Sequence, residues 1–557
     1  MYLVIVDTAQ IQPYIFGSNR LRENIGASYL VAQATGNWAK EAIRQVAPRN
    51  NIKVDGELDT QRCIENPTDK LDAEVFYTGG GNFVALFQTP EGARNFTRVL
   101  SRKVLTEAPN LQLVITQELL NWNGSESLSE KIKAAFKKLA AEKRARTLSA
   151  PLLGLGVTVM CRSTGLPAVG MAPAIGDDPE RPASAEIFAR LRAVEQADQR
   201  LRTLLLPPAN YDYPNRADHL GGTKGEHNFI AVVHADGNGL GQRIMDIGKT
   251  YPNPSQNRDY INALRSFSEA VNRAATAALC ETLEKLSARI QDDKGKKVII
   301  HKNASGQELV KIELKSQGGN WLLPFRPLVF GGDDVTFVSE GRLGLSLAIE
   351  YLQQLEKHTT HLPDGKGRLT ACAGIAIVKA HYPFARAYAL ADELCKKAKK
   401  YRKEIRNLHH DWDDGCLDWH FALSGLSGGI EVIREREYKV NAGWLTLRPV
   451  TLNANPKESG RSWSVVRKGI EAFQDLPPST QPGQEPKWST RRNKLKALRD
   501  ALREGPDSIK NFLTKFNEGR PLPDVDPSLV DWKNAGWQGG YCGHFDALEL
   551  ADWFIPL

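Results

Sequence analysis

Two short runs in the second half of the chain restrict its possible folds more than any other feature. The run FIAVVHADGNGLGQ, residues 229–242, is typical of a buried strand that carries Asp236 into a glycine-rich turn. The run LVFGGDDVTFV, residues 328–338, predicts two strands joined by a turn that holds Asp333 and Asp334. Because Mg²⁺ prefers oxygen ligands and takes one or two carboxylates from a protein, these strand ends predict a divalent-metal site.

Nucleotidyl transfer is the chemistry that such a site suits. Two metal ions about 4 Å apart can activate a 3′-hydroxyl and neutralise the leaving pyrophosphate. The glycines at 237, 239 and 241 remove side chains where backbone N–H groups could approach a triphosphate, at the mouth of a helix expected from about Leu240. Aspartate and glycine also suit ordinary turns, but the apolar run before each acidic turn favours the catalytic interpretation.

The order of elements after Asp236 predicts a ferredoxin-like palm. The expected elements are a helix over 258–287, the strand KVIIH, the GGDD hairpin, a helix over 343–357, a strand over 369–378 and a helix over about 383–401. In this β-α-β-β-α-β topology the first strand lies beside the hairpin, so Asp236 and the GGDD turn should converge.

The first half repeats this plan with altered chemistry. The run YLVIVDTAQIQPYIF places Asp7 at the end of an opening strand, and AEVFYTGGGNFVALF predicts a hairpin whose turn, residues 79–82, has no acids. Asp7 corresponds to Asp236, and Asn82 to Asp334. This half could hold a base and ribose, or it could simply complete the fold, because a glycine-rich turn also has a purely conformational use.

The chain is therefore expected to be an α+β protein with two ferredoxin-like palms and a mostly helical C-terminal domain. The expected divisions are 1–165, a degenerate palm with a basic helix at about 128–146; 166–226, a connector with a helix at about 184–204 and a linker; 227–425, the catalytic palm; and 426–557, a packing or partner domain. The run EREYKVNAGWLTLRPVTLN, residues 435–453, reads as strands, and a helix is expected near 490–503.

Composition excludes several classes of protein. Hydrophobic residues make up 41% and charged residues 25% of the 557, as in ordinary globular proteins, and no run is long enough to span a membrane. Seven scattered cysteines argue against a disulfide framework and a zinc ribbon, and the start MYLVIVDTAQ has no export signal, so a cytoplasmic location is expected. The net charge of +8 is compatible with nucleotide or RNA partners.

The cluster LHHDWDDG, residues 408–415, is interpreted as structural.

Taken in order, five motifs resemble the large polymerase-like subunit of type III CRISPR effector complexes and its stand-alone relatives with two palms. They are DTAQIQPYIFGSNRLRENIGASYL from Asp7, YTGGGNFVALF from Tyr77, HADGNGLG from His234, FGGDDVTFV from Phe330, and GIAIVKAHYPFARAYALADELCKKAKK from Gly374. The resemblance covers roughly residues 1–420. It implies an enzyme that makes cyclic oligoadenylates from ATP with Mg²⁺ or Mn²⁺, two ions per site, as a second messenger in antiviral defence.

The resemblance also implies site residues. The catalytic residues would be Asp236, Asp333 and Asp334, and these together with Gly237 would be the metal ligands. The nucleotide-binding residues would be Gly237, Asn238, Gly239, Leu240, Gly241, Gly331, Gly332, Lys399, Gly80 and Asn82. Lys399 would lie near phosphate, by similarity to diguanylate cyclases, although it stands in a lysine run that could be a solvated face.

Three departures from the family favour a stand-alone signalling enzyme. The first palm strand starts at residue 3, so no HD nuclease domain is expected; Cys161 has no partner cysteine for a zinc insert; and Asn238 stands where many relatives carry a second Asp. Alternative functions are a scaffold or cyclase subunit of a type III ribonucleoprotein, and a cyclase that uses GTP. A homo-oligomer is possible, and RNA or companion subunits are possible partners that are not expected to be required.

Overall fold

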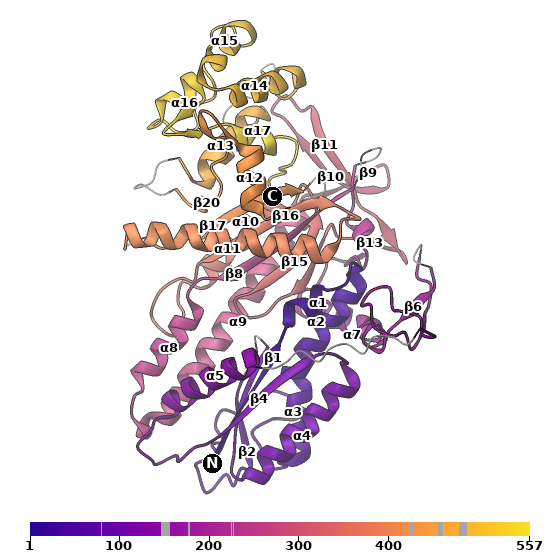
Figure 1. The fold of residues 1–557 in the computed structure, drawn as a ribbon, viewed down its shortest axis with the longest axis vertical. Helices are drawn as coiled ribbons and strands as arrows, with labels where there is room; N and C mark the ends of the chain where they lie inside the picture. Colours follow the sequence, from indigo (N-terminus) through magenta and orange to yellow (C-terminus); the bar gives the residue numbers. More distant parts are fainter. Residues whose placement is uncertain are drawn as a thin grey trace.

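The protein is described by a computed structural model of its 557 residues. The structure describes all of them except 80, 146–155, 177–178, 224–225, 227, 411, 423–427, 455–459 and 478–486. Figure 1 shows an elongated molecule with the first palm at one end and the C-terminal helices at the other.

The first palm has the expected ferredoxin-like topology. Its elements are β1 (Tyr2–Ala9), α1 (Ile11–Phe16), α2 (Leu21–Thr35), α3 (Asn37–Val46), β2 (Ala73–Gly79), β3 (Asn82–Phe87), α4 (Pro90–Glu107), β4 (Gln112–Leu119) and α5 (Leu128–Ala145). The sheet order is β2-β3-β1-β4, with β1 antiparallel to both neighbours. The central strand pairs Asp7 with Asn82, so the strand end meets the hairpin turn.

The second palm repeats this topology and extends it. Its elements are β8 (Phe229–Gly237), α8 (Leu240–Thr250), α9 (Asn257–Ala288), β14 (Phe325–Val329), β15 (Val335–Glu340), α10 (Gly344–His358), β16 (Ala371–Lys379) and α11 (Phe384–Leu408). The sheet order is β14-β15-β8-β16-β17-β20, in which β17 (Cys416–Ala422) runs parallel to β16 and β20 (Val450–Thr451) is antiparallel to β17. Both palms and the expected fold class are thus confirmed.

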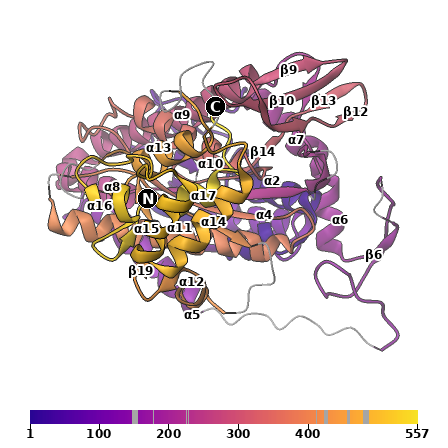
Figure 2. The same ribbon diagram turned by 90° about the horizontal axis from the view of Figure 1, so that it is seen from above.

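Small sheets lie outside the palms, and one of them corrects an expectation. The strand KVIIH does form, as part of β10 (Lys296–Lys302), but it pairs with β9 (Ile290–Asp293) and β11 (Glu308–Glu313) in a separate three-stranded sheet rather than in the palm. A second small sheet joins β12 (Ser316–Gln317), β13 (Asn320–Leu322) and β7 (Tyr211–Asp212), and a third joins β5 (Gly170–Ala172) and β6 (Arg181–Ala183). Figure 2 shows β6 projecting away from the rest of the molecule.

The connector and the C-terminal part also differ in detail from the expectations. The helix expected at about 184–204 is two helices, α6 (Ala185–Arg192) and α7 (Val194–Leu204). The first residues of the run expected as strands belong to α12 (Ile430–Tyr438), and only short strands follow it. These are β18 (Lys439–Val440) and β19 (Gly443–Trp444) before β20; the later elements are α13 (Trp463–Phe473), α14 (Arg492–Glu504), α15 (Pro506–Phe516), α16 (Val530–Ala535), β21 (Trp537–Gln538), β22 (Tyr541–Cys542) and α17 (Phe545–Leu550).

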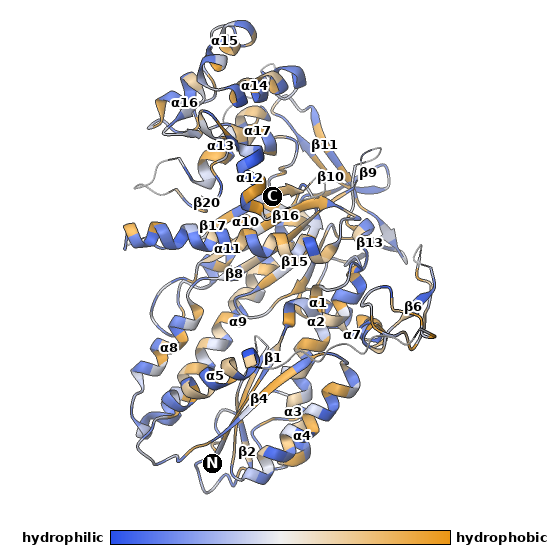
Figure 3. Cartoon of the chain, viewed as in Figure 1, coloured by the Kyte–Doolittle hydropathy of each residue, from blue (hydrophilic) through white to orange (hydrophobic). Residues whose placement is uncertain are grey.

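The two palms share their hydrophobic cores. One core joins Val4 and Val6 of β1 to Ile230 and Val232 of β8, and the ring of Phe16 stacks on Tyr388 of α11 with centroids 3.8 Å apart. A second core lies between the first sheet, α5 and the N-terminal half of α9. Figure 3 shows hydrophobic residues along the central strands of the second sheet and polar stretches on α5 and α11. Shared apolar burial of this kind fixes the palms against each other.

Candidate active site

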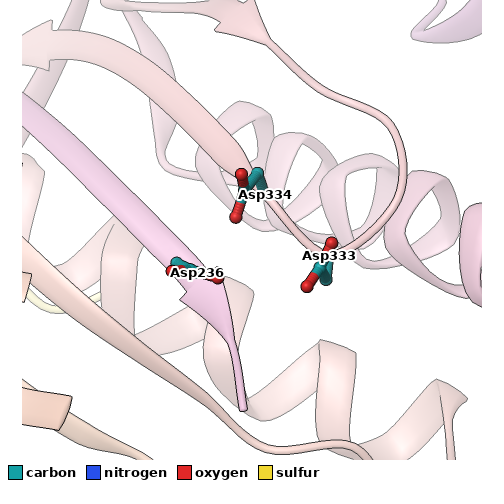
Figure 4. Close-up of side chains that lie close together, drawn as sticks. All are labelled: Asp236, Asp333 and Asp334. Carbon is teal, nitrogen blue, oxygen red and sulfur yellow. The ribbon is translucent and has the colours of Figure 1, made fainter. Parts of the chain in front are cut away.

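The three aspartates that the sequence singles out converge at one edge of the second sheet. Strand β15 runs antiparallel to β8 with Val335 opposite Ala235, and this register brings Asp334 beside Asp236. Figure 4 shows Asp333 and Asp334 in the hairpin turn, facing Asp236 at the end of its strand. One carboxylate oxygen from each of the three lies within 4.8 Å of the others. An all-oxygen set of this size fits Mg²⁺ or Mn²⁺.

Electrostatic crowding shifts the protonation of the two hairpin acids. Burial, and then the charge of Asp236, raise the pKa of Asp333 to about 6. Burial and the charges of Asp236 and Asp333 raise the pKa of Asp334 to about 8. The Asp334 side chain reaches solvent, so repulsion by the two neighbouring carboxylates is the firmer cause of its shift. A bound cation would relieve this repulsion.

Lys399 supplies a positive charge to the cluster. From α11 its ammonium forms an ion pair with Asp236 and donates a hydrogen bond to the carbonyl of Gly237 at 3.1 Å. Burial opposes the charged form, but Asp236 outweighs it and raises the pKa of Lys399. A carbonyl oxygen has two lone pairs, so Gly237 keeps one for a metal ion.

Glycines permit the close approach of the two turns. A Cβ atom on Gly237 would lie 2.5 Å from the Cβ of Asp333, so a larger residue would push the hairpin away. Gly331 and Gly332 have φ values of +123° and +75°, which non-glycine residues rarely adopt. The N–H of Gly332 donates to Asn272 Oδ1 of α9 at 3.3 Å, which ties the GGDD turn to that helix.

The turn after β8 divides into a fixed and an open part. Asn238 is buried, its N–H donates to the carbonyl of Thr370 at 2.8 Å, and its side-chain amide donates to Thr370 Oγ1 at 3.1 Å. The side chain of Asn238, an expected nucleotide-binding residue, thus anchors the turn to Thr370. Ideal Cβ atoms on Gly239 and Gly241 would meet open space, and the first N–H groups of α8, from Leu240 onward, have no partner within the helix.

The first palm reproduces this geometry without the paired acids. Lys143 of α5 forms an ion pair with Asp7 and donates a hydrogen bond to the Thr8 carbonyl at 2.9 Å, as Lys399 does to Asp236 and Gly237. Burial raises the pKa of Asp7, and Lys143 counters that rise. Asn82 lies opposite Asp7, while Gly80, an expected nucleotide-binding residue, lies outside the described residues.

Lys143, Tyr77 and Asn272 were not expected from the sequence. Tyr77 of β2 lies close enough to Asp333 that, after burial, the charge of this acid helps raise the pKa of Tyr77 to about 12. The hairpin of the first palm thus faces the acidic cluster of the second. Aligning the final helices of the two repeats would have identified Lys143; Tyr77 begins the YTGGG motif without any sign of its role, and no local pattern marks Asn272.

Two acids of the cluster at 408–415 make structural contacts. Arg402 Nε donates to Asp413 at 3.0 Å, and the backbone N–H of Asn453 donates to Asp414 at 2.9 Å. Asp411 lies outside the described residues. Among the residues that the structure describes, Asp236, Asp333 and Asp334 are the one set of three or more ligands close enough to hold a metal ion.

Comparison with known proteins agrees with this geometry. Residues 229–407 match the family described as Cas10/Cmr2, second palm domain. Similar solved structures include a Csm1-Csm4 cassette in complex with pppApApA, with TM-score 0.51, 14% identity and coverage of 99% of this chain and 69% of that chain. The same cassette with cA4 gives TM-score 0.50, 14% identity and coverage of 99% and 70%. Csm1 from T. onnurineus gives TM-score 0.50, 14% identity and coverage of 100% and 70%.

These structures share a fold with the chain, and no curated protein matches its sequence. In the part of the chain that the structure describes, no helix has both the length and the apolar character needed to cross a bilayer. The family match covers the acidic cluster and its supporting helices, and the structural matches extend over nearly the whole chain. Residues 229–407 therefore match the Cas10/Cmr2 second palm domain, and the chain as a whole has the fold of Csm1.

Proposed function

We propose that the chain is a metal-dependent nucleotidyltransferase that makes a cyclic oligoadenylate-like second messenger from ATP in antiviral defence. The observation that carries this proposal is the meeting of Asp236, Asp333 and Asp334 within 4.8 Å at the end of a palm sheet. Carboxylates that raise each other's pKa have no packing purpose, and perturbed acids of this kind concentrate at functional sites.

Different residues of the chain would bind the metal ions, balance the charge of Asp236, bind phosphate and position the second nucleotide. Asp236, Asp333 and Asp334, with the carbonyl of Gly237, hold Mg²⁺ or Mn²⁺, which when bound activates the attacking 3′-hydroxyl and stabilises the leaving pyrophosphate. Lys399 balances the charge of Asp236. The free N–H groups at the start of α8 receive phosphate oxygens, as helix N-termini commonly do. The hairpin of the first palm, which faces Asp333 through Tyr77, positions the second nucleotide.

Adenine is the proposed base. The similar Csm1-Csm4 cassette was solved with pppApA, pppApApA and cA4, which are two linear oligoadenylates and a cyclic one. A GTP-using cyclase would share the metal chemistry and differ in its base pocket. Incubating the purified chain with each nucleoside triphosphate and Mg²⁺, and identifying the products by mass, tests the choice. Cyclic adenylates from ATP alone are expected, whereas products from GTP alone would overturn it.

The second candidate is a scaffold or cyclase subunit that acts only within a ribonucleoprotein. The observation in its favour is that the similar structures pair Csm1 with a companion, Csm4. We propose that neither RNA nor a companion is required for the reaction, because all three acids and Lys399 come from this chain. Assaying the chain alone, and then with RNA and companion subunits added, separates the two.

A further inference from the structure

A cavity whose lining includes no residue of the acidic cluster has no role in the function proposed above. It has a volume of about 560 Å³ and lies between the end of α9, strands β9 and β10 of the small three-stranded sheet, α13 and the C-terminal tail. This volume is within the range of small-molecule sites. Its lining includes Arg289, Lys302 and Arg467, and one acid, Glu471.

The positive charges in this lining are incompletely balanced. Arg467 Nε binds Glu471 at 2.8 Å, one turn further along α13. Within the described part of the chain, the side chains of Arg289 and Lys302 have no hydrogen-bond or ion-pair partner. The Nε atom of Arg289 is buried and still has no hydrogen-bond acceptor among these residues. A buried guanidinium atom without a partner is costly, and an anion would satisfy it.

The remaining walls are hydrogen-bonded to one another and partly apolar. His301 Nε2 lies 3.0 Å from Gln474 Oε1, and the Gln474 amide donates to the carbonyl of Phe554 at 3.0 Å, so the small sheet, α13 and the C-terminal tail are joined. Burial lowers the pKa of His301, so it adds no charge at neutral pH. Ile300, Ile470 and Phe554 supply apolar surface beside the cations.

We propose that this cavity binds a phosphate-bearing small organic molecule of nucleotide size. The phosphate lies between Arg289, Lys302 and Arg467, and the organic part packs against the apolar wall. This site is separate from the acidic cluster, where three carboxylates repel a phosphate when no metal ion is bound. The inference does not depend on the proposed enzymatic function.

The test is calorimetric titration of the full chain in EDTA with AMP, with inorganic phosphate and adenosine as separate arms. One AMP per chain is expected, bound more tightly than phosphate or adenosine. Arg289→Gln combined with Lys302→Gln should weaken AMP binding by about tenfold or more, as loss of charge-assisted hydrogen bonds does. The control is Lys315→Gln, which removes an exposed lysine outside the cavity and should leave AMP affinity unchanged.

The double substitution should not destabilise the fold, because the replaced side chains have no partner in the described residues. Equal unfolding temperatures of the wild-type protein and the variants check this. Absence of AMP binding at millimolar concentration would overturn the proposal. So would an affinity that the double variant leaves unchanged but Lys399→Gln reduces, because AMP would then occupy the acidic site. Equal affinity for AMP and phosphate would overturn the role of the apolar wall.

Discussion

Crowding of negative charge is the main feature of the molecule at the residue scale. Asp236, Asp333 and Asp334 come within 4.8 Å of one another, and Lys399 neutralises one of them. The two carboxylates that are not neutralised repel each other and destabilise the fold. A bound cation would relieve this repulsion, so the arrangement is suited to binding one.

Replacing either hairpin acid should abolish product formation and leave the fold intact. Asp333→Ala and Asp334→Ala each remove a metal ligand from an accessible turn, where truncation creates no buried cavity. We expect product formation from ATP to fall by about a hundredfold or more, since even indirect supports of a metal site contribute 10–100-fold. Mass spectrometry of the products, beside circular dichroism, checks both parts. Wild-type turnover by both variants would contradict the metal assignment.

Stability should depend on pH through Asp334. Its folded-state pKa of about 8 is above the unfolded value, so the folded protein binds more protons and its unfolding free energy falls as pH rises from about 4 to about 8. Asp334→Asn removes the charge and should raise the unfolding temperature in EDTA at pH 8 by about 1–2 °C. Near pH 4 the difference should vanish. An equal shift at both pH values would contradict electrostatic repulsion as the cause.

Asp7 and Asp236 form a matched pair for mutation, because each is bound by a lysine from the last helix of its palm. Asp236→Ala should remove the single-turnover rate of ATP conversion. Asp7→Ala should change nucleotide affinity or stability and keep that rate, because the first palm has Asn82 where the second has Asp334. A loss of rate in Asp7→Ala as large as in Asp236→Ala, with ATP binding unchanged, would make the first palm catalytic.

At the scale of elements, α9 connects the two palms. Near its start, Arg258 and Arg265 bind the fully buried Glu74 of β2, each with an N–O distance of 2.7 Å. Further along, Asn272 accepts a hydrogen bond from the GGDD turn. One continuous helix thus fixes the distance between the hairpin of the first palm and the acids of the second.

Removing the charge of Glu74 should loosen this connection. Glu74→Gln leaves Arg265, which is almost fully buried, without its carboxylate, whereas Arg258 keeps its ion pair with Glu65. Loss of the carboxylate beside a buried arginine typically costs about 3–5 kcal/mol of unfolding free energy. The control is Glu118→Gln, whose partner Lys138 is exposed, and its cost should be less than about 1 kcal/mol. Urea unfolding measures both. Equal effects would show that the connection carries no special stability.

Much of the second palm could be predicted from sequence, because its signals are local. Apolar runs predicted β8 and β15, helical spacing predicted α9 (Asn257–Ala288), and the glycines predicted the turns. What failed depends on partners far apart in the chain. The strand KVIIH was recognised, but its pairing with β9 and β11 could not be read from its own residues. The break at Ala193 has no Pro or Gly to mark it, and Lys143 resembles any solvated lysine until α5 is placed against β1.

At the scale of the whole molecule, two similar palms differ in charge. Shared cores fix them together, and the hairpin of the palm without the paired acids faces the acids of the other. One palm would perform the chemistry while the other positions a nucleotide. The divisions expected at 165, 226 and 425 stay predictions, and the second sheet takes β20 from beyond the last of them.

The central claim is metal-dependent 3′–5′ nucleotidyl transfer by this chain alone. The most direct test is pyrophosphate release from ATP by protein purified under nuclease treatment and high salt, with Mg²⁺ or with EDTA. The account predicts release with Mg²⁺, none with EDTA, none from Asp333→Asn combined with Asp334→Asn, and none from 3′-deoxy-ATP, which lacks the attacking hydroxyl. Release by the double variant, or release only after RNA and companion subunits are added, would contradict it.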